Sequence, residues 1–403
     1  MDHQHSRRNF LRKGGAALGS ITFCSCGLLD AARAQTPPAV DMASARTGGG
    51  DDGDNPALKY RHPKAGSKRK HEVINGKRVK AIDVHAHCFI RETVAMAGPG
   101  YKVNAAVQGG PQFYILPASE TDTINQRFEY MDAKGVDMEV LSINPFWYAK
   151  NREVAADIIS IQNRKLAELC EAHPKRFTAF CSLALQHPDL AVEQLTTAMK
   201  LPGMRGAAIG GSVLGTDFSD PKFHPVWAKA EELGAVLFIH PQSTPQLGSR
   251  FKGNGWLGNT IGNPLDTTIA LQKLIFEGTL DKYPGLKVIG AHGGGYFPSY
   301  APRSDHSCTI SPANCDTSIT LKKQPTDYLK DQIFVDTLVF TPEALRHLVA
   351  QVGSSQVMIG TDSPIPWEIA PVDHVMATPG LTPTQRAAII GGNAAKLLRI
   401  TDI

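Results

Sequence analysis

From residue 80 onward, short apolar runs alternate with amphipathic stretches, and this alternation constrains the fold more than any other feature of the chain. Strands that alternate with helices pair in parallel, and eight of them favour a (β/α)8 TIM barrel over residues 80–403. A doubly wound open sheet is the alternative. The eight runs of strand type are KAIDVH, DMEVLSI, FTAFCSL, RGAAIGG, AVLFIH, LKVIGAH, QIFVDT and QVMIGTD.

Three connections that follow predicted strands are long, at residues 88–127, 241–265 and 293–330. Long connections inside a compact domain are usually functional, and those at the C-terminal ends of barrel strands build active sites. We therefore expect long insertions at the C-terminal face of the barrel.

The first strand of the pattern carries an unusual group of polar residues, in the segment AIDVHAH. Side chains alternate in direction along a strand, so Asp83, His85 and His87 are predicted to share one face. His85 and His87 would supply half of a metal site, and Asp83, one step deeper, is expected to orient an imidazole. A hydrogen-bonded pair of core histidines is the alternative for this segment alone.

Three further strands also end in residues that bind metals. They are His240, His292 and Asp362. Barrel strands converge at this end, and unpaired imidazole and carboxylate groups there are costly without a cation or a proton network. The whole set therefore favours a metal site.

These motifs resemble those of the amidohydrolase superfamily, and more narrowly its amidohydrolase-2, or aminocarboxymuconate-semialdehyde decarboxylase, branch. The similar segments are D-x-H-x-H, H-P, A-H-G-G-G, G-T-D-x-P and the closing IIGGNAAKLL, and the resemblance covers roughly residues 80–403. It implies a barrel that holds one divalent ion, with His292 activating the bound water or substrate. The ligands that it implies are His85, His87, His240 and Asp362.

Binuclear amidohydrolases place a carboxylated lysine at the end of the fourth strand, where this chain reads RGAAIGGSVLG. Because that segment has no lysine, one metal ion is expected. Zinc is the expected ion and manganese the alternative, since a site of three histidines and one aspartate accepts either.

Two reactions fit this site. The favoured one is non-oxidative decarboxylation of an aromatic or unsaturated carboxylic acid, with His292 and Asp362 as the catalytic residues that carry the proton. Hydrolysis of a lactone or amide by a metal-activated water is the alternative. A catalytically silent barrel would have a damaged ligand set, whereas this set is complete.

The substrate contacts follow from the same resemblance. Arg303 stands eleven residues after His292, where the resembling decarboxylases use an arginine that reaches the neighbouring subunit's site. This implies a homodimer and a carboxylate partner for Arg303, while a surface arginine is the alternative. The segment GGPQFYILPAS lacks those enzymes' second carboxylate-binding arginine, which favours an aromatic acid with Tyr114 and Trp256 as further substrate contacts.

The N-terminus has the features of a targeting sequence. Arg7 and Arg8 precede a mildly apolar stretch and small residues that end at Ala34, which resembles a twin-arginine export signal, disordered and cleaved near Ala34. This predicts a periplasmic protein, with a basic N-terminal arm as the alternative. Residues 35–79 are predicted to be a flexible linker and arm.

Charge and composition argue against a nucleic-acid partner and against a membrane span. The net charge is only +4 and the basic residues form no long stripe, so nucleic acid is not an expected partner. The chain contains no run of 18 or more apolar residues, so no membrane-spanning helix is expected. Cys308 and Cys315 share the segment CTISPANC, and a bridge between them is left open.

Overall fold

The structure is a computed structural model that describes residues 71–98, 115–116, 121–368 and 370–401. The predicted export signal, most of the predicted linker and Tyr114 lie outside the described residues. The last part of the predicted arm is an antiparallel hairpin of β1 (Glu72–Ile74) and β2 (Lys77–Val79). Asn75 and Gly76 form its turn with φ of 53° and 73°, as Asn-Gly does in two-residue hairpins.

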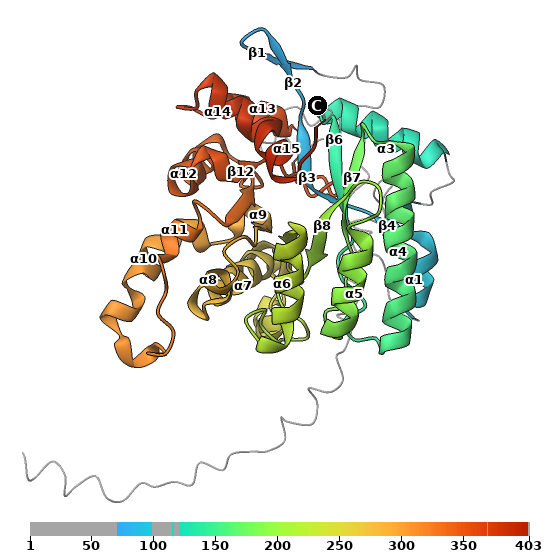
Figure 1. The fold of residues 1–403 in the computed structure, drawn as a ribbon. Coiled ribbons are helices and arrows are strands. Elements are labelled where there is room, and N and C mark those ends of the chain that lie inside the picture. The colour runs from blue at the N-terminus through green and yellow to red at the C-terminus, as the bar shows by residue number, and fades with distance from the viewer. Residues whose placement is uncertain (1–70, 99–114, 117–120, 369, 402–403) are drawn as a thin grey trace, which may run out of the picture. The chain divides into compact units, whose positions relative to one another are not determined.

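Eight parallel strands form the central sheet, in the order β12-β11-β10-β9-β8-β7-β6-β3. Figure 1 labels β3, β6, β7, β8 and β12 among them. All eight predicted strands are confirmed. Their bounds are β3 (Ile82–His87), β6 (Met138–Ser142), β7 (Phe177–Cys181), β8 (Met204–Ile209), β9 (Val236–Ile239), β10 (Val288–Gly290), β11 (Ile333–Asp336) and β12 (Val357–Met358).

The two ends of this sheet meet and close it into a barrel. Val84 donates its backbone N–H to the Ile359 carbonyl at 2.9 Å, and Asp362 donates to the His85 carbonyl at the same distance. A parallel bridge between Ala86 and Ser363 continues the pairing. Because consecutive strands are neighbours and the edges meet, the open doubly wound sheet is excluded and the TIM barrel is confirmed.

Two hydrophobic clusters define the two faces of the barrel wall. One fills the interior and includes Val140, Phe180 and Phe238, whereas the other lies between sheet and helices and includes Leu141 and Leu237. Neighbours along a strand therefore belong to opposite clusters, as the alternation of strand side chains requires.

Helices surround the strands (Figure 1). The longer ones are α3 (Thr121–Lys134), α4 (Arg152–Ala172), α5 (Pro188–Ala198), α6 (His224–Leu233), α7 (Asn263–Phe276), α10 (Phe297–Ile310) and α12 (Pro342–Val352). The shorter α-helices are α1 (Arg91–Met96), α8 (Thr279–Lys282), α9 (Ala291–Gly294), α11 (Pro325–Tyr328), α13 (Pro371–Ala377), α14 (Pro383–Ala387) and α15 (Asn393–Leu397). Within the described residues, no helix is both long and apolar enough to cross a membrane.

The long connections carry structure of their own. The first includes a two-stranded parallel sheet of β4 (Phe89–Ile90) and β5 (Ile115–Leu116). The connection after β9 forms η6 (Pro245–Phe251) and η7 (Gly258–Gly262), and the one after β10 contains α9, α10 and α11. A disulfide joins Cys308 to Cys315 at the end of α10, which settles the pairing that the sequence left open. Three further short turns are η5 (Pro221–Phe223), η8 (Pro312–Asn314) and η9 (Ser354–Gln356), and η10 (Ala388–Gly392) joins α14 to α15.

Candidate metal centre

Four of the predicted strand-end residues come together at the mouth of the barrel. His85 and His87 end β3, His240 follows β9 directly, and Asp362 lies in the segment after β12. All four are buried, and one potential ligand atom from each lies within 4.8 Å of the others. The structure therefore brings the predicted ligand set into one group.

A β-bulge in β3 determines which side chains face this group. Asp83 pairs with Glu139 and Ala86 with Leu141, so β3 has one more residue than β6 over this stretch. The extra residue lets both Val84 and His85 face the interior, where the His85 ring lies 5.1 Å from that of Phe238.

The prediction that Asp83 shares a face with His85 and His87 is therefore wrong, because strict alternation ignores the bulge. Asp83 instead accepts from the backbone N–H groups of His85 and Thr361, at 3.0 and 3.1 Å, and from the Thr361 hydroxyl. The Asp83 carboxylate therefore positions the backbone of β3 and of the segment after β12, and it does not orient an imidazole ring.

The hydrogen bonds of the two β3 histidines fix where their protons lie. His85 Nδ1 lies 2.7 Å from the Asp336 carboxylate, which can only accept, so this nitrogen carries the proton. Ser142 Oγ donates to the Ala86 carbonyl and therefore accepts from His87 Nδ1, at 2.9 Å. A ring in the neutral form that binds metals, with its proton on Nδ1, keeps a lone pair on Nε2.

The two Nε2 atoms lie close together. The Nε2 atoms of His85 and His87 are 3.1 Å apart, and Asp362 Oδ1 lies 3.3 Å from the first and 2.9 Å from the second. Two acceptor nitrogens and a carboxylate oxygen at such distances repel one another unless a cation or a shared proton lies between them.

His240 completes the group. Its Nε2 lies 4.0 Å from Asp362 Oδ1, and among the described residues neither ring nitrogen has a hydrogen-bond partner although both are buried. Buried polar atoms are rarely left in this state. Three imidazoles and a carboxylate are a donor set that divalent transition metals accept, so these residues fit a metal ion.

The electrostatic field favours a positive charge at the same point. Although burial disfavours its charge, the His85 and His87 imidazoles hold the pKa of Asp362 well below its ordinary value. Burial also opposes protonation of His85, but the Asp362 carboxylate and the bond to Asp336 raise the pKa of His85 to about 10. Burial lowers the pKa of His87, and it lowers the pKa of His240 well below its ordinary value. The ionised Asp362 and Asp336 carboxylates thus favour one positive charge among these imidazoles, which a metal ion supplies when bound and a proton on His85 supplies otherwise.

His292 lies beside the four-residue group rather than in it. Its ring centroid is 5.2 Å from those of His85 and His240, and its buried Nδ1 has no partner among the described residues. Burial, followed by the charge of His85, lowers the pKa of His292 to about 4. The backbone there is left-handed at φ 57°, a conformation that costs free energy and is concentrated at functional sites.

Asp336 is a site residue that was not singled out in the sequence. Its carboxylate accepts from His85 Nδ1 and from the backbone N–H groups of His292 at 3.0 Å, Gly293 at 2.8 Å and Leu338 at 3.1 Å. Burial would raise its pKa, but the bond from His85 lowers it. The available signal was its position, because Asp336 ends β11 as His87 ends β3.

The predicted substrate contacts have different surroundings. Trp256 is 44% exposed and stacks on Trp367, with the two ring centroids 5.7 Å apart. The ring centroid of Phe340, which lies on the loop after β11, is 5.8 Å from that of Trp367. Arg303 is exposed on α10, and no contact among the described residues joins it to the four donors. Trp367 and Phe340 were not singled out in the sequence.

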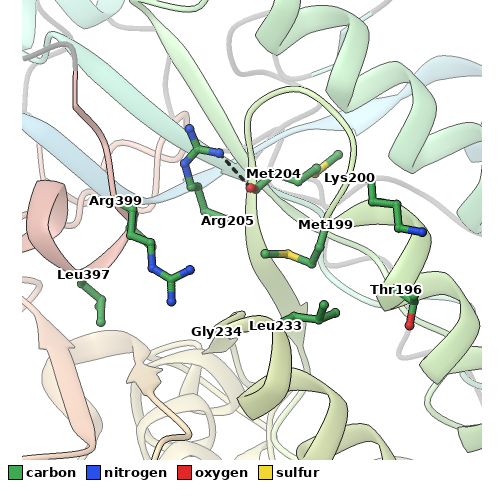
Figure 2. Close-up of a pocket in the computed structure, with 10 residues that line it drawn as sticks. Thr196, Met199, Lys200, Met204, Arg205, Leu233, Gly234, Leu397 and Arg399 are labelled. Atoms are coloured by element: carbon green, nitrogen blue, oxygen red, sulfur yellow. Dashed lines mark hydrogen bonds between the residues drawn. The ribbon is translucent and has the colours of Figure 1, made fainter.

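A cavity elsewhere in the barrel shares no residue with this site (Figure 2). It is lined by the start of β8, at Met204 and Arg205, by Leu233 and Gly234 before β9, and by the chain from Leu397 to Arg399. These positions lie at the N-terminal ends of the strands, opposite the mouth where the histidines converge. We therefore place the chemistry at the histidine group.

A barrel with polar strand ends that converge on a candidate metal position defines a metal-dependent TIM-barrel enzyme. The family model described as Amidohydrolase matches residues 82–400, and the chain belongs to this amidohydrolase-2 family. The resemblance noted from the motifs is thereby confirmed.

Three similar proteins illustrate the branch. The 2-amino-3-carboxymuconate-6-semialdehyde decarboxylase of Dictyostelium discoideum is 32% identical, over 68% of this chain and 75% of its own. A gamma-resorcylate decarboxylase of Rhodococcus jostii is 30% identical, over 71% and 90%. A crystal structure of 2,6-dihydroxybenzoate decarboxylase complexed with 2,6-dihydroxybenzoate is 26% identical with a TM-score of 0.69, covering 80% of this chain and 100% of that one.

The role of Asp336 can be tested by metal affinity. We expect Asp336→Asn to weaken metal binding about 10- to 100-fold, because the carboxylate that fixes a metal-binding imidazole is replaced by an amide. Competition with a chelator measures the affinity. Asp331→Asn, at the exposed opposite end of β11, is the matched control and should bind metal like the wild type. Equal affinity in all three proteins would contradict the assignment.

Proposed function

We propose that this protein is a metal-dependent, non-oxidative decarboxylase of an aromatic or unsaturated carboxylic acid. The observation that carries the proposal is the convergence of His85, His87, His240 and Asp362 on one point, with the Nε2 atoms of His85 and His87 3.1 Å apart. The reaction class is also supported by the three relatives described above, all of which are decarboxylases.

His85, His87, His240 and Asp362 would hold one divalent ion. Zinc suits three imidazoles and a carboxylate, and manganese is the alternative. A single ion also agrees with the end of β8, where Ile209 is followed by glycines and no lysine is present. When bound, the ion supplies Lewis-acid polarisation of the substrate's carboxylate and neighbouring oxygen.

The side chains of the site then have separate tasks. Decarboxylation breaks the bond between the carboxylate and its carbon, and the electron pair that stays on the carbon must receive a proton. His292 lies at the edge of the site with a free Nδ1, where it serves as general base or proton relay, and Asp362 is the second candidate donor. Asp336 holds both His85 and the backbone of His292 in place.

An aromatic acid is the substrate class that we propose. The Rhodococcus and 2,6-dihydroxybenzoate relatives are, as their names say, decarboxylases of phenolic acids. In this chain Trp256, Trp367 and Phe340 form an aromatic surface on loops that follow β9, β12 and β11, and Tyr114 is the further contact proposed from the sequence. Planar rings stack favourably on such surfaces.

If His292 transfers a proton and does not bind the metal, its removal should affect turnover but not metal binding. We expect His292→Ala to keep its metal but to release carbon dioxide at least about 100-fold more slowly, since general acid-base groups contribute factors of this size. The assay follows carbon dioxide from 2,6-dihydroxybenzoate and related phenolic acids. His224→Ala, at the start of α6, is the control.

Unchanged carbon dioxide release by His292→Ala would overturn this role. If metal-loaded wild-type protein releases acid from simple lactones but no carbon dioxide from any carboxylic acid, the protein is a hydrolase and the proposed reaction is wrong.

We further propose that the enzyme works as a homodimer in which Arg303 reaches the partner's site. Within its own chain Arg303 is exposed and makes no contact with the metal group among the described residues. A guanidinium on an exposed helix is free to bind a substrate carboxylate in a second subunit through two parallel hydrogen bonds.

Mixed subunits test this arrangement. We expect Arg303→Ala and His292→Ala to be nearly inactive alone, and their co-refolded mixture to regain about a quarter of wild-type activity, because half of the dimers are mixed and each contains one complete site. Activity no higher than the sum of the separate variants would show that Arg303 does not act across an interface.

Export through the twin-arginine route to the periplasm, with cleavage near Ala34, is proposed from the sequence of residues 1–34. The disulfide between Cys308 and Cys315 supports an oxidising location, because such bonds are rare in proteins of the cytosol.

A further inference from the structure

Four charged side chains are buried together behind the metal centre, in the layer between the barrel wall and α3. They are Asp83 and Arg127, with no exposed surface, Glu139 at 1% and Lys134 at 2%. Burying charges is expensive, and even a well-paired buried ion pair is often no more stabilising than apolar packing. Their presence therefore calls for a reason other than stability.

The geometry of this group follows from the strand pairing. Asp83 and Glu139 are direct partners across β3 and β6, so two carboxylates lie side by side on the outer face of the barrel. Both cations come from α3, seven residues apart and thus on one face of the helix. Arg127 Nε donates to Glu139 at 2.6 Å. Lys134 is linked to Asp83 by the Thr361 hydroxyl, which accepts from Lys134 and donates to Asp83.

The contacts of Thr361 show how Lys134 acts. The Thr361 hydroxyl accepts from Lys134 Nζ at 2.9 Å and from the Ser363 backbone N–H at 3.1 Å, and both of these groups can only donate. Its single hydrogen is therefore directed to the third neighbour, Asp83, at 2.5 Å. Lys134 and the Ser363 N–H thus occupy both lone pairs of the hydroxyl and hold it in the position from which it donates to Asp83, and this bond ties the β12 segment to β3.

This buried network reaches the backbone of three of the four proposed metal ligands. Asp83 accepts from the backbone N–H of His85 at 3.0 Å, and Arg127 donates to the His87 carbonyl at 2.9 Å. Thr361 immediately precedes Asp362, whose backbone is left-handed at φ 59°. For a residue other than glycine that conformation costs free energy, so it must be imposed by its surroundings.

We propose that α3 is the positioning element of the metal centre, and that Lys134 is a positioning residue that holds His85 and Asp362 at metal-binding distance through Thr361 and Asp83. The inference rests on the proposed function only in taking the four converging residues as the metal ligands. Its readout is metal affinity, which is measured without any turnover.

The test compares two variants that remove a buried polar side chain. Lys134→Met keeps an unbranched side chain as far as Cε but removes the terminal amino group, with its charge and its hydrogen bond. Gln332→Met is the matched control, because Gln332 is also 2% exposed and its amide donates to the carbonyls of Leu280, Tyr283 and Leu286, near the N-terminal end of β11. Both variants should lower the unfolding temperature.

Only Lys134→Met should weaken the binding of Zn²⁺ or Mn²⁺, by about ten-fold or more, in competition with a chelator. Wild-type metal affinity in Lys134→Met would overturn the proposal and leave Lys134 a structural residue. An equal loss of affinity in Gln332→Met would overturn it as well, since general loosening of the barrel would then explain both.

A second pair of variants covers failure of Lys134→Met to fold. Thr361→Val keeps the shape of the side chain but removes the hydroxyl, whereas Thr361→Ser keeps the hydroxyl. We expect the metal affinity of Thr361→Val to fall and that of Thr361→Ser to stay near that of the wild type. Equal metal affinities in these two variants would contradict the proposal that Lys134 acts through the Thr361 hydroxyl. Failure of the proposed decarboxylation would leave both comparisons unaffected.

Discussion

The carboxylate of Asp336 is the contact on which the arrangement of the site depends. It accepts a hydrogen bond from the His85 ring on β3 and from the backbone of His292 and Gly293 after β10, so one ionised group fixes two strands that are far apart in sequence. By holding the proton on His85 Nδ1, it leaves the Nε2 lone pair directed at the centre of the barrel mouth. Without this bond no carboxylate would hold the proton on Nδ1, and the ring could take up the other tautomer.

The remaining features of the site bring further donors to the same point. The bulge in β3 turns His85 inward beside His87, and left-handed backbone at His292 and Asp362 directs their side chains at strand ends where an extended chain would not. Such conformations persist only when neighbouring contacts impose them. Asp336 supplies those contacts for His292, and we propose that the buried network from α3 supplies them for Asp362.

The sequence was sufficient to predict the eight strands and the four residues that converge at the barrel mouth, because apolar runs and the polar residues that end them are local patterns. It was insufficient for features that depend on pairing. Asp83 was assigned to the wrong face, because a bulge is a property of two strands and the alternation of one strand does not show it. Thr361 and Lys134 meet across 227 residues, and His85 and Asp336 across 251, separations at which no local pattern links them.

The most direct test of the central claim is anomalous diffraction from crystals of the protein loaded with Zn²⁺ or Mn²⁺. The account predicts one ion, at roughly 2.0–2.2 Å from the ring nitrogens of His85, His87 and His240 and from an oxygen of Asp362. An ion bound elsewhere, or crystals in which these four side chains surround no metal under saturating conditions, would contradict it.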